Sequence, residues 1–187
     1  MCHVNRLGKR MLFRIGLGCA AWCLGSGIAW AQVTVFLPDT SQTTTLTANV
    51  SEQARVVVPA SVTFSVTDVA TATPATAAAV TIDRIVLANA TKQFRISVQA
   101  GAATFTPPVV ATTTWSASDV TWNAPSWTNA TGSAGTLSSS AYTTLATCVA
   151  DASACSTTGL VFTLAAKATV QRAGSHTLSV TWKFESF

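Results

Sequence analysis

The sequence predicts an all-β domain, folded as a single antiparallel β-sandwich of the immunoglobulin-like, Greek-key type with about eight to ten strands. Apolar and polar residues alternate with period two in several separate stretches. Thr and Val are abundant, and their branched Cβ atoms suit a pleated strand. Turn pairs containing Gly or Pro separate the stretches at intervals typical of hairpins and Greek-key crossings.

The first 31 residues have the pattern of a cleaved N-terminal signal peptide. A basic start is followed by an apolar stretch over 15–28 and by the A-x-A site Ala29-Trp30-Ala31, so the mature chain is expected to begin at Gln32. A start at Met11 would keep the apolar stretch. The stretch is short and Gly-rich for a membrane span, and no later run approaches 18 apolar residues. We therefore expect export without a membrane span.

Removing residues 1–31 leaves 187 − 31 = 156 residues, which fits one domain over 32–187. Four of the 11 basic residues leave with the signal, so seven remain against seven acidic residues. Nucleic-acid binders and basic membrane-surface proteins need clustered Lys and Arg. A neutral mature chain argues against both classes.

Four strands are predicted most clearly, because each has an apolar residue at every second position: 61–67, 93–99, 160–164 and 177–185. Each exposes one apolar face that a second layer must cover. Weaker candidates are 33–37, 44–50, 55–58, 80–87, 109–115 and 120–123. The segment 116–158 is low in charge and rich in Ser, Thr, Ala and Asn, and we expect it to be an irregular excursion with short strands and the least ordered part of the domain.

The two cysteines of the expected mature chain, Cys148 and Cys155, predict a structural disulfide that closes a small hairpin or loop. A metal site would need further Cys or His ligands, and only His176 remains after the signal. No nucleophile turn such as G-x-S-x-G is present. We expect no metal, no cofactor and no catalytic residue, and we interpret His176 as a strand-edge histidine.

Three tryptophans close together in a polar segment are the candidate glycan-binding residues: Trp115, Trp122 and Trp127. Aromatic rings exposed on a flat β surface stack against sugar rings, which would make a cell-wall or extracellular polysaccharide the partner. Alternatively, the three rings are buried and cover the end of the sandwich.

The start of the mature chain suggests a second kind of partner. Val33, Val35 and Leu37 alternate with polar or aromatic neighbours. This segment is expected to form either an edge strand of its own domain or a strand donated to a neighbour's sheet. In the second case the partner is another copy of the chain.

Two segments carry a resemblance to known families: Val57-Val58-Pro59-Ala60-Ser61-Val62-Thr63-Phe64, and the closing run from Gly174 to Phe184. They resemble WxL-type cell-surface domains, spore-coat-U proteins and fimbrial subunits. The resemblance implies a β-sandwich without enzymatic activity that serves in surface attachment or assembly. Phe184 stands where the WxL motif has Leu and a second copy of the motif is missing, so peptidoglycan binding is assigned to no residue.

These patterns together predict an exported, non-catalytic bacterial surface protein with a structural or adhesive role. The expected location is the cell surface, the periplasm or the extracellular medium. One alternative is a carbohydrate-binding module that uses exposed tryptophans. The other is a fimbria-like subunit that assembles through its terminal strands.

Overall fold

The computed structural model describes residue 41 and residues 43–187, and the chain divides into two units, Met1–Leu46 and Thr47–Phe187. The described residues of the first unit are exposed and have no regular secondary structure. The expected signal peptide, the start of the mature chain and the expected strand 33–37 lie outside the described residues.

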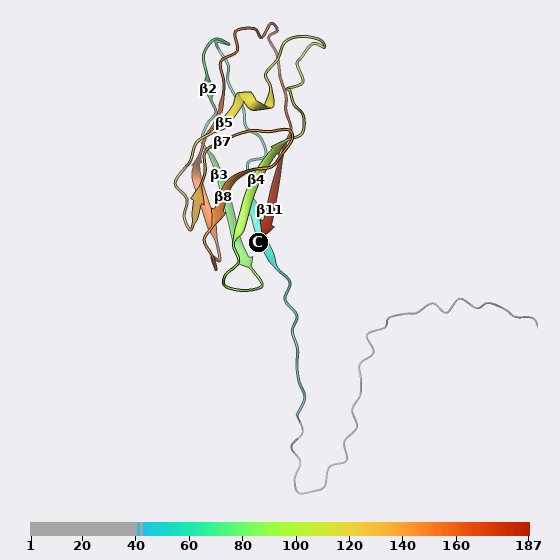
Figure 1. The fold of residues 1–187 in the computed structure, drawn as a ribbon, viewed down its shortest axis with the longest axis vertical. Helices are drawn as coiled ribbons and strands as arrows, with labels where there is room; N and C mark the ends of the chain where they lie inside the picture. Colours follow the sequence, from blue (N-terminus) through green and yellow to red (C-terminus); the bar gives the residue numbers. More distant parts are fainter. Residues whose placement is uncertain (1–40, 42) are drawn as a thin grey trace, which may run out of the picture. The chain divides into compact units, whose positions relative to one another are not determined.

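The second unit is built from short antiparallel strands, as the sequence predicts, and the described residues contain no α-helix (Figure 1). A 3-10 turn, η1 (Ala117–Asp119), precedes β5. The strands are β1 (Gln53–Val57), β2 (Thr73–Pro74), β3 (Ala78–Val86), β4 (Phe94–Ala100), β5 (Val120–Trp122), β6 (Ala130–Gly132), β7 (Gly135–Thr136), β8 (Thr143–Cys148), β9 (Cys155–Leu160), β10 (Phe162–Leu164) and β11 (Val180–Ser186).

These strands form three antiparallel sheets, with the orders β1-β3-β9, β2-β10-β5-β7 and β11-β4-β8-β6. Only Val161 separates β9 from β10 in the chain, so the first two sheets follow one another along a continuous stretch of backbone. In the third sheet, β4 pairs with β11 on one side and with β8 on the other. The strand β11 is therefore an edge strand.

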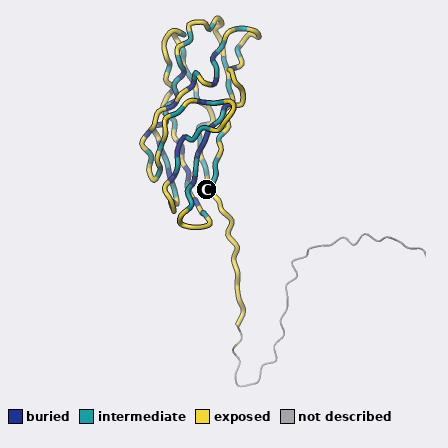
Figure 2. The backbone as a smooth tube through the Cα atoms, viewed as in Figure 1, coloured by how far each residue is buried: buried dark blue, intermediate teal, exposed yellow. Residues whose placement is uncertain are grey.

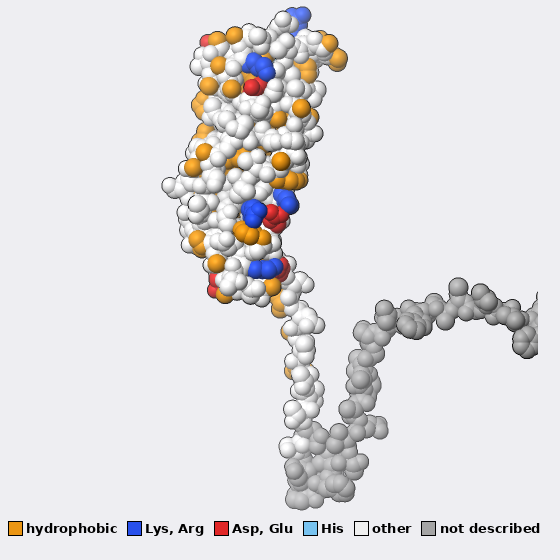
Figure 3. All heavy atoms as spheres, viewed as in Figure 1, with side chains coloured by type: hydrophobic (Ala, Val, Ile, Leu, Met, Phe, Trp, Pro, Cys, Tyr) orange, Lys and Arg blue, Asp and Glu red, His pale blue; other side chains and the backbone are white. Residues whose placement is uncertain are grey.

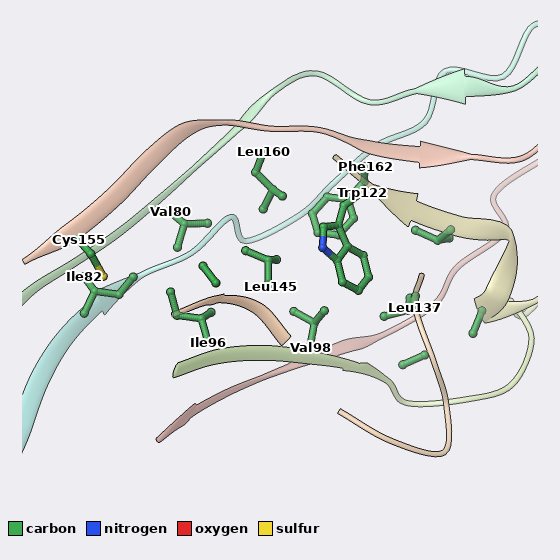
Figure 4. Packing of buried hydrophobic residues seen from close by; sticks show 14 of the residues in the cluster. Val80, Ile82, Ile96, Val98, Trp122, Leu137, Leu145, Cys155, Leu160 and Phe162 are labelled. Carbon is green, nitrogen blue, oxygen red and sulfur yellow. The ribbon is translucent and has the colours of Figure 1, made fainter. Parts of the chain in front are cut away.

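One hydrophobic core draws on all three sheets (Figure 4). In β3 the apolar residues at alternate positions are buried, with Val80 and Ile82 fully so, because successive side chains of a strand point to opposite faces. Leu160 at the end of β9 packs in the same cluster as Leu145 of β8. Figure 2 shows buried residues concentrated in these strands and an exposed run leading into β1.

Several predicted strands are confirmed: 80–87 corresponds to β3, 93–99 to β4, 120–123 to β5 and 177–185 to β11. The segment 116–158 contains short strands as expected, β5 to β8 and the start of β9, but the expectation that it is the least ordered part of the domain is wrong, because these strands belong to the sheets. Leu137 and Leu145, each isolated among Ser and Thr, are buried there and anchor it to the core. The candidate strands 44–50 and 109–115 form no strand.

The disulfide between Cys148 and Cys155 is present, with 5.9 Å between the Cα atoms. Both side chains are fully buried. Cys148 ends β8 and Cys155 begins β9, which belong to different sheets. The bond therefore closes a loop between two sheets and ties them together at that end.

The segment 61–67 is the most informative departure from the sequence prediction. Its backbone is in no strand, yet its burial alternates as a strand's would, with Val62, Phe64 and Val66 half-buried and the residues between them exposed. Within the described residues, no backbone hydrogen bond involves 59–67. Pro59, which lacks an N–H donor, separates this segment from β1. The predicted strand 61–67 is therefore not formed, although its apolar face is half-buried as the alternation indicates.

Candidate functional site

The second unit has an open groove of about 1050 Å³. One wall is the unpaired stretch Pro59–Val69, and the other runs from Val170 through the first half of β11 to Trp182. Its floor is apolar and consists of Phe105, Trp115, Val120, Leu137, Phe162 and Leu164. We call this feature the groove.

Both walls have backbone groups that no other strand uses. Among residues 43–187, the segment 61–67 has no backbone hydrogen bond, and the strand that pairs with β11 is β4. Unpaired strand edges are templates for a further strand, because their N–H and C=O groups remain free to pair. Both walls of the groove therefore present backbone that is unpaired within the described residues.

The side chains along the walls are buried only in part. Phe64 packs against the core from one wall, and Leu178 and Trp182 do so from the other, but all three remain partly exposed. Val180, in the second wall, is 37% exposed. Alternating apolar residues at half burial on both walls are the pattern expected where a strand that would cover them is absent.

Aromatic side chains and His176 order the floor and one end of the groove. The Trp115 ring meets Phe105 and His176 edge-on, with ring centroids 6.4 and 5.2 Å away, and Trp115 Nε1 donates to the Ala165 carbonyl oxygen at 3.0 Å. His176 Nε2 donates to the Arg172 carbonyl oxygen at 2.9 Å. Its Nδ1 lies 2.8 Å from Thr114 Oγ1 and accepts from that hydroxyl in the neutral tautomer.

Glu52 forms a polar clasp at the start of β1. Its Oε2 accepts a hydrogen bond from Ser186 Oγ at 2.6 Å, and its Oε1 lies 2.9 Å from Lys92 Nζ and accepts from the Ala88 N–H at 2.7 Å. The hydrogen bond from Ser186, followed by those from Lys92 and Ala88, lowers the pKa of Glu52 to about 2. The clasp joins the beginning of the second unit to the end of β11 and to the loop between β3 and β4.

The other ion pairs are partly exposed and stabilise local structure. Arg55 donates to Asp83 across β1 and β3 at 2.7 Å, which lowers the pKa of Asp83. Burial raises the pKa of Asp119, but its hydrogen bonds with Lys167 and with the Ser116 N–H outweigh burial and lower it. Figure 3 shows the same arrangement on one face, where basic and acidic side chains are few and mostly adjacent.

The candidate glycan-binding tryptophans do not form an exposed platform. Trp115 and Trp122 are 4% and 3% exposed, and the Trp122 Nε1 donates to the Ser133 carbonyl oxygen at 2.8 Å. Trp127 is half-buried and packs against Gly132. The reading as exposed glycan-stacking residues is wrong for Trp115 and Trp122, because their rings form part of the core.

The described residues were also examined for metal-binding side chains and for membrane-spanning helices. Within residue 41 and residues 43–187, no cluster of three or more His, Cys, Asp and Glu side chains is arranged to hold a metal. The same part of the chain has no helix with the length and hydropathy needed to cross a membrane. His176, at the end of the groove, bonds with the Thr114 hydroxyl and the Arg172 carbonyl oxygen.

Sequence reasoning found the apolar faces of both groove walls but missed the groove itself. A signal was present in the sequence, because 61–67 is the one of the four clearest alternating segments that begins two residues after a proline, Pro59. Glu52 was also missed, because a clasp between residues 134 positions apart leaves no local pattern. No family model, curated protein or solved structure matches this chain.

Proposed function

We propose that this chain is a non-catalytic structural subunit of an exported bacterial surface assembly, in which each groove receives an extended segment from another copy. The observation that carries the proposal is the apolar groove between two unpaired strand edges. Adding a strand to an open sheet edge is a general mode of protein recognition, in which backbone hydrogen bonds supply affinity and alternate side chains fill pockets.

This proposal also gives the finer description of the fold. We infer that the three sheets make one immunoglobulin-like sandwich and that the donated strand completes the layer containing β11. Seven residues of wall over 61–67 correspond to roughly 23 Å of extended chain. A groove wall of this length suits an extended peptide, and the volume of about 1050 Å³ is at the upper end of the range for ligand sites.

The donated segment is assigned to 44–50. Leu46, Ala48 and Val50 alternate there with Thr45, Thr47 and Asn49. Leu46 is 92% exposed and Val50 is 72% exposed, so no described residue covers this apolar face. Seven residues of alternating pattern match the seven residues of the 61–67 wall.

The donor is another copy, because the chain's own segment 44–50 cannot reach the wall. If the chain turned back at Ser51 and Glu52, Val50 would face Gln53 and residue 44 would face Pro59. The segment would then run beside β1 and stop short of 61–67. The clasp at Glu52 also holds that position to Ser186 and Lys92, which opposes a tight turn there.

Export rests on the N-terminal pattern and is supported by the disulfide. A buried disulfide between Cys148 and Cys155 suits an oxidising compartment. The proposed location is therefore the cell surface, the periplasm or the extracellular medium. The ion pairs are partly exposed and lie between neighbouring elements, and the groove is lined mostly by apolar residues. Both features are consistent with a structural role.

The experiment is size-exclusion chromatography with light scattering on the full chain, expressed with its own N-terminus and purified from the exported fraction. We expect oligomers for the unmodified chain and monomers for the double variant L46D/V50D. The matched control is T45D/T47D, which places the same charges on the opposite face of the segment and should still assemble. Monomers from the unmodified chain at high concentration, or equal assembly by both variants, would refute the proposal.

A further inference from the structure

The loop between β3 and β4 carries a motif that the groove does not use. Residues 88–91 of this loop are exposed, and Figure 1 shows the loop projecting where β3 ends and β4 begins. It contains the triplet Asn89-Ala90-Thr91, which matches the N-x-[ST] acceptor pattern for N-glycosylation. Such triplets also arise by chance in a chain rich in Thr, so the pattern alone assigns no site.

The Asn89 side chain is held by three hydrogen bonds to one atom. Its Oδ1 accepts from the Thr91 N–H at 3.0 Å, from the Thr91 hydroxyl at 2.7 Å and from the Lys92 N–H at 3.1 Å. Backbone N–H groups can only donate, so the atom that they face is the oxygen. Within the described residues, no group accepts a hydrogen bond from Asn89 Nδ2. Because Asn89 is exposed, this nitrogen is open to a reagent from solvent.

The three donors counteract the low reactivity of a side-chain amide. The lone pair of an amide nitrogen is delocalised into the carbonyl group, and it becomes available when the nitrogen loses a proton. Negative charge then develops on Oδ1, to which the Thr91 hydroxyl and two N–H groups already donate. Donors that are in place where charge develops lower the barrier of a reaction. The Thr91 hydroxyl therefore favours reaction at Asn89 Nδ2.

A second matching triplet, Asn129-Ala130-Thr131, lacks this geometry. Asn129 Nδ2 already donates to the Ala154 carbonyl oxygen at 3.2 Å. Asn129 also has a left-handed backbone, with φ 54°, and Thr131 lies in β6 opposite Thr147 of β8. The nitrogen of Asn129 is therefore engaged, and the sheet holds the end of the triplet.

The third matching triplet, Asn49-Val50-Ser51, lies in the exposed run before β1, which has no regular structure. Among the described residues, no hydrogen bond joins Ser51 to the Asn49 amide. The arrangement seen at Asn89 would have to form there when the reagent binds, and ordering a flexible chain opposes this. Asn89 is thus the one of the three asparagines whose amide is both free at nitrogen and held at oxygen.

We propose that Asn89 is an N-glycosylation site, which receives a sugar activated as a diphosphate ester. In the transfer, Nδ2 gives one proton to a base of the transferase and attacks the anomeric carbon of the sugar. A bond forms between Nδ2 and this carbon, while the carbon–oxygen bond to the diphosphate breaks and the diphosphate leaves with the electron pair. The diphosphate is carried by a nucleoside or by a polyprenol. The site lies outside the lining of the groove, so this proposal and strand donation can be refuted separately.

Intact-mass spectrometry tests the assignment on the full chain, recovered from the exported fraction of the cells that make it naturally. We expect a mass above that of the polypeptide by whole sugar units, located on the peptide that contains Asn89. Forms that differ by one sugar indicate a nucleotide-linked donor, whereas one preassembled block indicates a polyprenyl-linked donor. N49Q and N129Q should carry the same sugar. A chain at its polypeptide mass, or with the sugar on another residue, would overturn the proposal.

Substitutions in the loop separate the chemistry from folding. N89D keeps an oxygen for the three donors and replaces the nitrogen, so it should abolish the modification with little change in the urea midpoint. T91S keeps the hydroxyl and should retain the sugar, whereas T91V should lower the occupancy of Asn89 about tenfold or more, because it removes a donor to Oδ1. The control T71V removes a comparable hydroxyl, which donates to Asp68, and should leave occupancy unchanged. A sugar retained by N89D, or equal occupancy in T91V and T71V, would overturn the assignment.

Discussion

Glu52 accepts a hydrogen bond from Ser186, with 2.6 Å between Oε2 and Oγ, and so joins the first residue before β1 to the last residue of β11. Lys92 completes the contact through its ion pair with Glu52. The segment proposed as donor therefore leaves the body beside the strand that forms one wall of the groove. Because Glu52 is held beside Ser186, a copy that donates residues 44–50 must keep the end of its own β11 close to the donated segment.

The clasp should make stability depend on pH in the acid range. Hydrogen bonds hold the pKa of Glu52 at about 2 in the folded protein, against an ordinary value of 4.5. Its contribution is therefore present above pH 4.5 and is lost as the pH falls toward 2. In urea unfolding at pH 5 and pH 2.5, the midpoint of E52Q should fall less than that of the unmodified chain.

The control for this measurement is D151N, because Asp151 is exposed and forms no ion pair within the described residues. D151N should show the full acid-dependent fall of the unmodified protein. Asp83, Asp119 and Glu185 also have lowered pKa values, so part of the fall should persist in E52Q. An equal fall in E52Q and the unmodified chain would exclude a stabilising charge at Glu52.

Breaking the disulfide should destabilise the fold without changing the groove. The bond closes a loop of eight residues, counting Cys148 and Cys155, for which the chain-entropy account gives about 2–3 kcal/mol. The double variant C148S/C155S should lose about that free energy of unfolding in urea titrations. At temperatures where it remains folded, its affinity for a peptide of residues 43–51 should stay close to that of the oxidised protein. If the free energy of unfolding did not fall, the bond between the two sheets would not stabilise the fold.

Gly135 should not tolerate a side chain. A Cβ at this position would overlap the Trp122 ring, which lies in the core. G135A should lower the free energy of unfolding by about 1–3 kcal/mol, the usual cost of overpacking. G101A is the matched control, because a Cβ there would meet Ser179 at an ordinary 3.5 Å. Similar stability for both variants would contradict the packing at Trp122.

Substitutions on the two faces of the segment 61–67 should affect peptide binding differently, as they would in a strand. V62D places a charge on the half-buried face of 61–67 and should weaken binding of the 43–51 peptide about tenfold or more, since a carboxylate is costly to bury. T63D changes the exposed neighbour and should bind nearly as the unmodified wall does. Isothermal titration of the 43–51 peptide into chains that lack residues 44–50 measures the affinity of both variants. Equal loss in the two variants would argue against an apolar contact at Val62.

The sequence predicted the β class, the disulfide and several strands, because each depends on local alternation or on a simple pairing of two cysteines. It did not predict β6, β7 and β8, whose residues are mostly Ser, Thr, Ala and Gly. There, single residues such as Leu145 provide the burial, and no periodic pattern results. The groove could not be predicted from the sequence either, since the alternation in 61–67 indicates an apolar face but not whether a neighbouring strand covers it.

Amide hydrogen exchange on the assembled chain tests the central claim most directly. In assemblies of the full exported protein, the amides of 61–67 and the free edge of β11 should exchange slowly, because the donated segment supplies their hydrogen-bond partners. In the monomeric L46D/V50D variant the same amides should exchange fast, while those of β4 remain protected. Equal exchange of 61–67 in both forms would show that no strand enters the groove and would contradict the account.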